Sequence, residues 1–380
     1  CALLASWLVL AVAISLVALI QGSGTISYAI GAWATPLGIE YRIDMASGLM
    51  ILIIATIGAM TMLFAGRSIQ SEIPKRQTGL FYTCFLLCLT GLMGVVVTGD
   101  AFNLFVFLEI SSLSSYVLIS MGPSRRALTA AFQYLIMGTI GATFILVGIG
   151  LLYMMTGTLN LVDLSNRLAG VADTRTIRVA FAFITVGVSI KLALFPLHLW
   201  LPNAYTFAPS AVSAFVAATA TKVGASVLLR FFFTVFGIQF SFEAMHVGEI
   251  LMVLSVAAIL VASVVAIFQS NVKRMLAYSS VAQIGYIILG ISLASLSGVS
   301  AAMIHIFNHA LIKGALFLAL GCIFLRLGST ELRDIRGIAK QMPWTMAAFV
   351  ASGLGLIGIP LTAGFVSKWY LVIAALGQGY

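Results

Sequence analysis

The sequence predicts an all-α, polytopic membrane protein, and three observations indicate this fold class. Of its 380 residues, 61% are hydrophobic and only 8% are charged, whereas soluble domains usually carry about 25% charged residues. Eleven segments are apolar enough to cross a bilayer, which takes about 20 residues each. Most of the basic residues lie in every second connection between these segments. We therefore expect a multi-pass protein of the inner or plasma membrane.

The expected spans follow one another along the whole chain. They lie at 1–20, 45–66, 79–98, 101–121, 127–154, 178–200, 209–236, 247–269, 274–294, 299–326 and 343–376. The 35 glycines are spread through these runs, as is typical of membrane helices, in which Gly permits close packing. Because the chain opens at Cys1 without an initiator Met and its last run is still apolar, we expect further helices beyond both ends.

The distribution of basic residues predicts the orientation. One set of alternate connections holds Arg67, Lys75, Arg76, Arg125, Arg126, Lys273, Arg274, Arg326, Arg333, Arg336 and Lys340. The other set holds only Arg42, Arg167, Arg175 and Arg178. Cytoplasmic connections carry the excess of Lys and Arg in membrane proteins, so the first set is predicted to be cytoplasmic. The net charge of +9 is explained by orientation, and we expect no nucleic-acid partner.

Two segments contain helix breaks. Pro196 and Pro202 are expected to end a helix that begins near Arg178, and Gly358 with Pro360 interrupts the eleventh segment. The sixth and eleventh segments run in opposite directions, and paired broken helices in opposed halves are typical of inverted-repeat transporters. We expect N-terminal helices at 1–78, a first repeat at 79–236 and a truncated second repeat at 247–380.

Several ionisable side chains lie at bilayer depth, where they are costly and mark functional sites by default. They are Glu109, Lys191, Lys222, His305, His309, Lys313 and Lys368. Residues four apart share a helix face, so the two histidines and Lys313 form a stripe that rises roughly 12 Å. Histidine exchanges protons near neutral pH, and desolvation disfavours a charged lysine. We interpret the set as a proton relay; hydrogen-bonded packing between helices is the alternative.

Other polar residues have simpler interpretations. His198 either shapes the turn after the first break or assists proton uptake. Lys273 and Arg274 are expected to be cytoplasmic anchors. Ser279 and Gln283 line a hydrated path or bond neighbouring helices.

Several chemistries have no signature in the chain. The four cysteines form no CxxC pair and indicate neither a disulfide framework nor a zinc or haem site. Nucleotide, hydrolase and metalloprotease motifs are missing as well. We expect no cofactor and no catalytic chemistry of its own. An ion gradient or a partner would then drive the protein. If it is part of a redox complex, it would be a translocase subunit.

Five ordered motifs carry a family resemblance. They are TGDAFNLFVFLEISSLSSYVL, KLALFPLHLWLPNAYTFAPSAVSA, VKRMLAYSSVAQIGY, HIFNHALIKGALFL and GIPLTAGFVSKWY. Together they resemble the antiporter-like, proton-translocating subunits of complex I, membrane-bound hydrogenases and Mrp-type cation/proton antiporters, and the first looks most similar to the D-type subunit of the Mrp antiporters. The resemblance implies fourteen helices with inverted five-helix repeats, of which this chain has about eleven.

The resemblance also implies a role for each buried charge. Glu109 matches the glutamate of the family's fifth helix, Lys191 the lysine of the broken seventh helix and Lys222 the connecting lysine of the eighth. Lys313 matches the central lysine of helix eleven, with His305 and His309 on its face. Lys368 matches the residue of the broken twelfth helix, which is Glu in one complex I homologue.

These expectations lead to one main hypothesis and three alternatives. The main hypothesis is a subunit of a multisubunit antiporter that exchanges protons for a monovalent cation, Na⁺, with other membrane subunits as partners. The alternative in the same family is a redox-driven proton-pump subunit of complex I or a hydrogenase. A self-sufficient solute carrier and an inert scaffold subunit are the alternatives of other classes.

Overall fold

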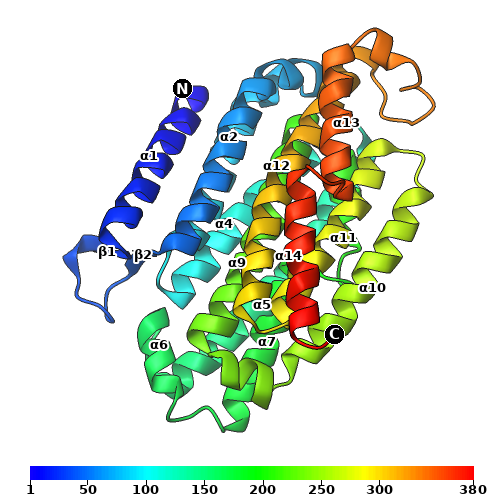
Figure 1. Cartoon of the computed structure of the whole chain (residues 1–380). Helices are drawn as coiled ribbons and strands as arrows, with labels where there is room; N and C mark the ends of the chain where they lie inside the picture. The colour runs from blue at the N-terminus through cyan, green and yellow to red at the C-terminus, as the bar shows by residue number, and fades with distance from the viewer.

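The computed structural model describes residues 1–380, which form an α-helical bundle with one two-stranded hairpin (Figure 1). The helices are α1 Ala2–Ser23, α2 Met45–Glu72, α3 Thr78–Val97, α4 Ala101–Ser120, α5 Arg125–Thr156, α6 Leu161–Leu168, α7 Arg175–Leu192, α8 Trp200–Phe207, α9 Ser210–Leu229, α10 Val247–Ile267, α11 Val272–Ser292, α12 Leu296–Leu327, α13 Pro343–Ile357 and α14 Ala363–Gly377. Strands β1 Ile26–Ala29 and β2 Glu40–Ile43 pair antiparallel. Short 3₁₀ turns lie at Ile30–Ala32, Lys75–Gln77 and Ile338–Lys340, and π-helical turns at Arg230–Val235 and Gln239–Ala244.

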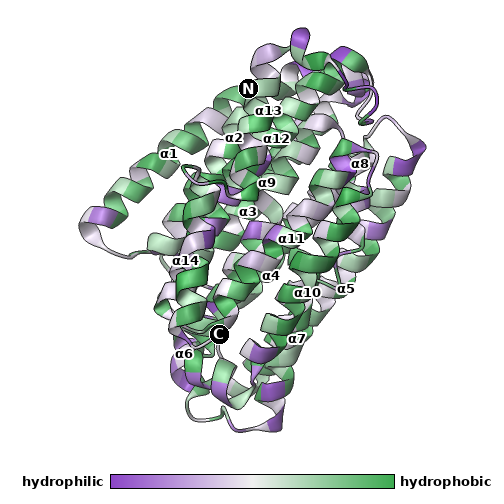
Figure 2. Cartoon of the chain, turned by 45° about the vertical axis from the view of Figure 1, so that its right-hand side comes forward, coloured by the Kyte–Doolittle hydropathy of each residue, from purple (hydrophilic) through white to green (hydrophobic).

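The expected membrane fold is confirmed. Nine helices are long and apolar enough to cross a membrane. The sixth expected segment is divided between α7 and α8, and the eleventh between α13 and α14. Hydrophobic residues cover the sides of the bundle and hydrophilic ones gather toward its ends (Figure 2), which is the surface that a bilayer requires.

The two breaks differ in detail from the expectation. Leu192 ends α7, and Pro196 lies in the non-helical stretch before α8. Pro202 does not end a helix; it lies in the first turn of α8, where a missing backbone N–H costs no hydrogen bond. Gly358, in the left-handed conformation, ends α13 as expected. The break therefore needs one proline in the first repeat and one glycine in the second.

Two elements were not expected from the sequence. The hairpin β1–β2 lies in the connection before the second span, and the eight-residue helix α6 lies between α5 and α7. Each strand has only four residues, too few for a clear alternating pattern. Helix α6 begins at Asn160, whose side chain accepts hydrogen bonds from the N–H groups of Val162 and Asp163.

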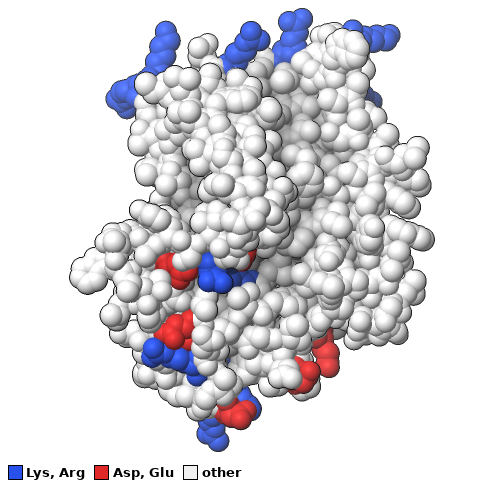
Figure 3. Space-filling model, turned by 60° about the vertical axis from the view of Figure 1, so that its left-hand side comes forward, with Lys and Arg blue, Asp and Glu red and all other residues white.

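Charge is distributed unequally between the two ends of the bundle. On the face that Figure 3 shows, the end where α2 ends and α13 begins carries only Lys and Arg, whereas acidic and basic side chains appear together toward the other end. This separation follows the count of basic residues in alternate connections. By the same rule, we call the first end cytoplasmic and the second end outer.

Helix α9 forms the centre of the bundle. Of the candidate spans it is the most enclosed, with 83% of the apolar window of Ser210–Val235 buried. It packs against α2, α7 and α12. A side chain on α9 is therefore far from both lipid and water unless a cavity reaches it.

Candidate proton-transfer site

Lys191 lies in the last turn of α7, directly before the first break. Its Nζ donates to Glu109 Oε1 of α4 at 2.9 Å and to Ser112 Oγ at 2.8 Å. Ser112 stands three residues after Glu109, so one face of α4 presents both acceptors. The lysine side chain is 5% exposed and the glutamate 22%. The structure thus brings Glu109 and Lys191 together in an ion pair whose lysine is buried and whose glutamate is partly exposed.

Lys222 lies in the middle of α9 and is fully buried. Its Nζ donates to the carbonyl of Ala217, five residues earlier on the same helix, and no carboxylate lies within ion-pair distance. A charged ammonium at this position keeps a single protein acceptor for its three N–H groups.

The stripe on α12 is confirmed as a buried row. His305 contacts Gln283 of α11 through Nε2 at 3.0 Å and Ser367 of α14 through Nδ1 at 2.9 Å. The ring of His309 stacks near it, with centroids 6.1 Å apart, and neither of its nitrogens has a hydrogen-bond partner.

Lys313 completes this row one turn farther along α12. Its Nζ donates to the Leu276 carbonyl at 2.7 Å and to Ser279 Oγ, both on α11. Ser279 and Gln283 of α11 thus form hydrogen bonds to side chains of α12. This agrees with the interhelical bonding that is one of the two interpretations of these residues. The row thus places an imidazole with two unsatisfied nitrogens between two hydrogen-bonded side chains.

Lys368 closes the second break. Its Nζ donates to the carbonyls of Leu356 and Ile357, each at 3.0 Å, and lies 4.6 Å from the ring centroid of Tyr286. These carbonyls are the last of α13, where the helix dipole favours a positive charge. The lysine of the second repeat is therefore held by a helix end and an aromatic face, without a carboxylate.

His198 lies in the first break and is 6% exposed. Its ring stacks on Phe195 with centroids 5.3 Å apart and approaches Tyr278 of α11 at 6.4 Å. The next two residues, together with Tyr278, line an open cavity of about 550 Å³ in the half of the bundle toward the cytoplasmic end. This position fits the expected role in proton uptake, which stays a proposal.

The geometry agrees with known proteins over the whole chain. The family described as "NADH:quinone oxidoreductase/Mrp antiporter, TM" matches residues 98–379. The chain belongs to this family. NADH-quinone oxidoreductase subunit N of Desulforudis audaxviator is 46% identical over 352 residues, which cover 93% of this chain and 70% of that protein. The D-type subunit of the Na⁺/H⁺ antiporter of Alkalihalophilus pseudofirmus is 32% identical, with 92% of this chain and 70% of that protein covered.

Two solved structures share the fold of this NADH:quinone oxidoreductase/Mrp antiporter chain. A chain of the archaeal membrane-bound sulfane sulfur reductase superposes with a TM-score of 0.93 at 33% identity, over all of this chain and 76% of the other. A chain of the Mrp complex from Dietzia sp. DQ12-45-1b gives 0.91 at 30% identity, over all of this chain and 69% of the other. The family resemblance, the multi-pass membrane fold and the multisubunit setting are confirmed.

Sequence reasoning missed one buried polar cluster at the cytoplasmic end. Lys273 was interpreted as a cytoplasmic anchor, but it is 5% exposed and donates to the Ala208 carbonyl at 3.0 Å, a buried contact that was not predicted. Glu72 accepts from the N–H of Ser210 at 2.8 Å and so caps α9 from the end of α2. Both side chains hold the connection between α8 and α9. No local pattern could have revealed contacts between residues so far apart in the chain.

Arg230 was also missed, because it falls inside an apolar run. Its guanidinium donates to Ser47 Oγ at 2.7 Å and lies 3.6 Å from Asp44. Its being the only arginine in the apolar seventh segment could have indicated a buried charge there. No group of three His, Cys, Asp or Glu side chains is placed to hold a metal ion.

Proposed function

We propose that this chain is the proton-translocating membrane subunit of a multisubunit Na⁺/H⁺ antiporter. Protons pass along the middle of the membrane from the Glu109–Lys191 pair through Lys222 to the row on α12 and then to Lys368. The observation that carries this proposal is the series of ionisable groups from α4 to α14, which are buried between its half-buried ends Glu109 and Lys368. Apart from the Glu109–Lys191 pair, these groups have no carboxylate partner. Placing unpaired ionisable groups inside a membrane costs free energy, and such groups mark functional sites.

The Glu109–Lys191 pair acts as the switch of the first repeat. With the pair closed, the carboxylate stabilises charged Lys191. When the pair opens, the ammonium is left in a poorly solvated site and its proton moves on toward Lys222. Waters bridge the remaining gaps, and each broken helix opens a half-channel toward one side of the membrane.

The order of the elements supports two repeats of opposite orientation. Helices α3, α4 and α5 precede the broken pair α7–α8, and α10, α11 and α12 precede the broken pair α13–α14. In each series the last unbroken helix has 32 residues. We propose that residues 79–236 and 247–380 are these repeats.

The test is cation-dependent proton flux in inverted membrane vesicles that hold the whole complex. Addition of Na⁺ should dissipate a pH gradient in vesicles with the intact subunit and fail to do so with Glu109→Gln. Equal flux in both, with the complex assembled, would refute the proposal.

A second candidate function in the same family is a subunit of a redox-driven proton pump. The 46% identity to an NADH-quinone oxidoreductase subunit favours it. Lys368 argues against one complex I subunit, in which this position is Glu. Purification of the complex distinguishes the two: small antiporter subunits support the first function, whereas iron–sulfur subunits and electron-driven pumping support the second.

A further inference from the structure

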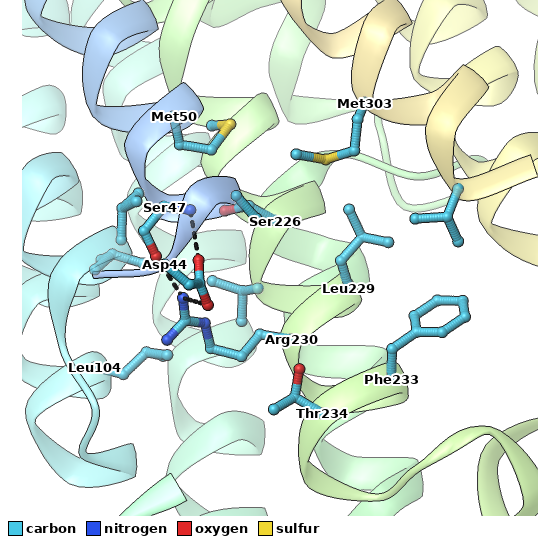
Figure 4. Close-up of a pocket in the computed structure, with 15 residues that line it drawn as sticks. Asp44, Ser47, Met50, Leu104, Ser226, Leu229, Arg230, Phe233, Thr234 and Met303 are labelled. Carbon is cyan, nitrogen blue, oxygen red and sulfur yellow. Dashed lines mark hydrogen bonds and ion pairs between the residues drawn. The ribbon is translucent and has the colours of Figure 1, made fainter. Parts of the chain in front are cut away.

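A cavity of about 190 Å³ lies at the outer end of the bundle between α2, α9 and α12 (Figure 4). It is lined mostly by apolar side chains, with Met50 and Met303 on one side. Its polar lining comprises Asp44, Ser47, Arg230 and Thr234, with Ser226 from α9. The relay described above uses none of these polar residues. The volume has room for several waters, and its polar groups supply partners for them.

The cavity reaches the helix face that carries Lys222. Ser226 lines it and stands one turn after Lys222, about 6 Å along α9 on the same face. Ser226 is partly exposed, whereas Ala225 and Val227 beside it are buried. On the most enclosed span of the protein, this exposure arises where the cavity meets the helix.

Lys222 lies one turn from Ser226 on α9, next to the part of the helix that the cavity reaches. Its Nζ bonds to the carbonyl of Ala217, toward the cytoplasmic end of α9 and away from Ser226. A lysine side chain reaches about 6 Å, so rotation about its torsions carries the ammonium from Ala217 to the neighbourhood of Ser226. One side chain can thus face the relay in one position and the cavity in the other.

Two opposite charges lie at the mouth of the cavity, the negative charge of Asp44 outermost and the positive charge of Arg230 deeper. The Asp44 side chain is 41% exposed and the Arg230 side chain 14%, so an ion from outside meets the carboxylate first and the guanidinium second. Arg230 is held by Ser47 Oγ at 2.7 Å and by the Thr98 carbonyl at 3.4 Å. A fixed arginine in a narrow aqueous path raises an electrostatic barrier against cations.

We propose that this cavity is an outward-facing aqueous vestibule through which Lys222 exchanges protons with the outer side, and that Arg230 excludes Na⁺ from it. The inference rests on the proposed function for the direction of proton transfer. The vestibule would separate the proton path of this subunit from the path of the cation.

The test labels cysteines in the full-length protein within its complex, in membranes and with native cysteines replaced. Two impermeant methanethiosulfonates of similar size are applied from outside, one with a trimethylammonium group and one with a sulfonate. Ser226→Cys should react at least about tenfold faster than the matched control Ala225→Cys, which lies at the same depth but is 1% exposed. Equal rates, or reaction only from the cytoplasmic side, would overturn the vestibule.

The charge filter is read from the ratio of the two rates at Ser226→Cys. Replacing Arg230 with Gln should raise the cation-to-anion ratio about tenfold, and Arg230→Lys should leave it near that of the parent. Should the Gln variant fail to assemble, Asp44→Asn gives an independent reading. Asn caps a helix as well as Asp does, and losing the outer carboxylate should lower the ratio. An unchanged ratio in either assembled variant would refute the filter.

The labelling experiment tests the vestibule, and the transport experiment tests the relay. If Ser226→Cys reacts as expected while Lys222→Ala retains normal Na⁺-dependent proton flux, the cavity is open to the outer side but Lys222 exchanges no protons through it, and the relay through Lys222 is wrong. If flux is lost in Lys222→Ala but Ser226→Cys is unreactive, the relay stands and its outer path lies elsewhere.

Discussion

The Glu109–Lys191 pair offers the sharpest test of the relay. Glu109→Gln keeps the size and a hydrogen-bond acceptor of the side chain but removes its charge. At the observed 2.9 Å and an effective dielectric constant of about 20, two unit charges attract by about 6 kcal/mol. Desolvation offsets part of this, and breaking a buried pair costs about 3 to 5 kcal/mol. Because Ser112 still bonds the ammonium, we take the lower end, about 3 kcal/mol.

A loss of about 3 kcal/mol in the charged state of Lys191 should slow the step that loads it by about two orders of magnitude. Glu109→Asp keeps the charge but shortens the side chain by about 1.5 Å, which leaves about 4 kcal/mol of attraction. We expect Asp to reduce Na⁺-dependent proton flux about tenfold and Gln about a hundredfold.

The assay is the same inverted-vesicle measurement with a pH-sensitive dye, normalised to the amount of assembled complex. If Glu109 only packs helices together, Gln should work as well as Glu and better than Asp. That order of activities would refute the reasoning.

Three further perturbations test other parts of the structure. Lys313→Ala should abolish or strongly reduce proton flux, because the α12 row loses its last proton carrier, while co-purification of the other subunits shows intact assembly; normal flux would exclude this role. Gly364→Ala should lower the thermal unfolding midpoint of the purified complex, because the added Cβ would lie 1.8 Å from the Gly355 carbonyl oxygen; an unchanged midpoint would contradict this packing. Cysteines at Arg125 and Lys340 should resist an impermeant reagent applied outside intact cells and react in inverted vesicles, and the reverse pattern would overturn the orientation.

The sequence predicted most of the fold because membrane spans have a local signature. Each of the eleven segments is recognised from its own residues, and a lysine or glutamate inside such a run is conspicuous. For the same reason the breaks were placed at Pro196 and Gly358, whose backbone preferences act locally.

Interactions between distant segments were not predictable in this way. Lys273 follows the usual pattern of a helix-end anchor, and only the packing of α11 against α8 and α9 buries it. Arg230 is far from Asp44 along the chain, and nothing near it in the sequence indicates a carboxylate. The hairpin strands are too short to show an alternating pattern.

The two broken helices use different hydrogen-bond donors for the backbone carbonyls at their ends. A helix that ends inside a membrane leaves carbonyls that must find hydrogen-bond partners. At the first break, Trp200 Nε1 of α8 donates to the Ile190 carbonyl at 3.1 Å, which leaves Lys191 free to pair with Glu109. At the second break, Lys368 of α14 itself takes the last two carbonyls of α13.

This difference predicts different mobility for the two lysines. Lys191 can leave Glu109 without breaking a hydrogen bond to a backbone carbonyl, because its ammonium bonds only side chains and the Ile190 carbonyl is bonded by the indole of Trp200. Lys368 cannot lose its charge without weakening two hydrogen bonds and its contact with Tyr286. A proton that reaches Lys368 is therefore stabilised by the break itself, and its release requires that break to move. On the proposed mechanism we therefore expect the first repeat to pass a proton by changing one ion pair, and the second to couple proton release to a change in backbone structure.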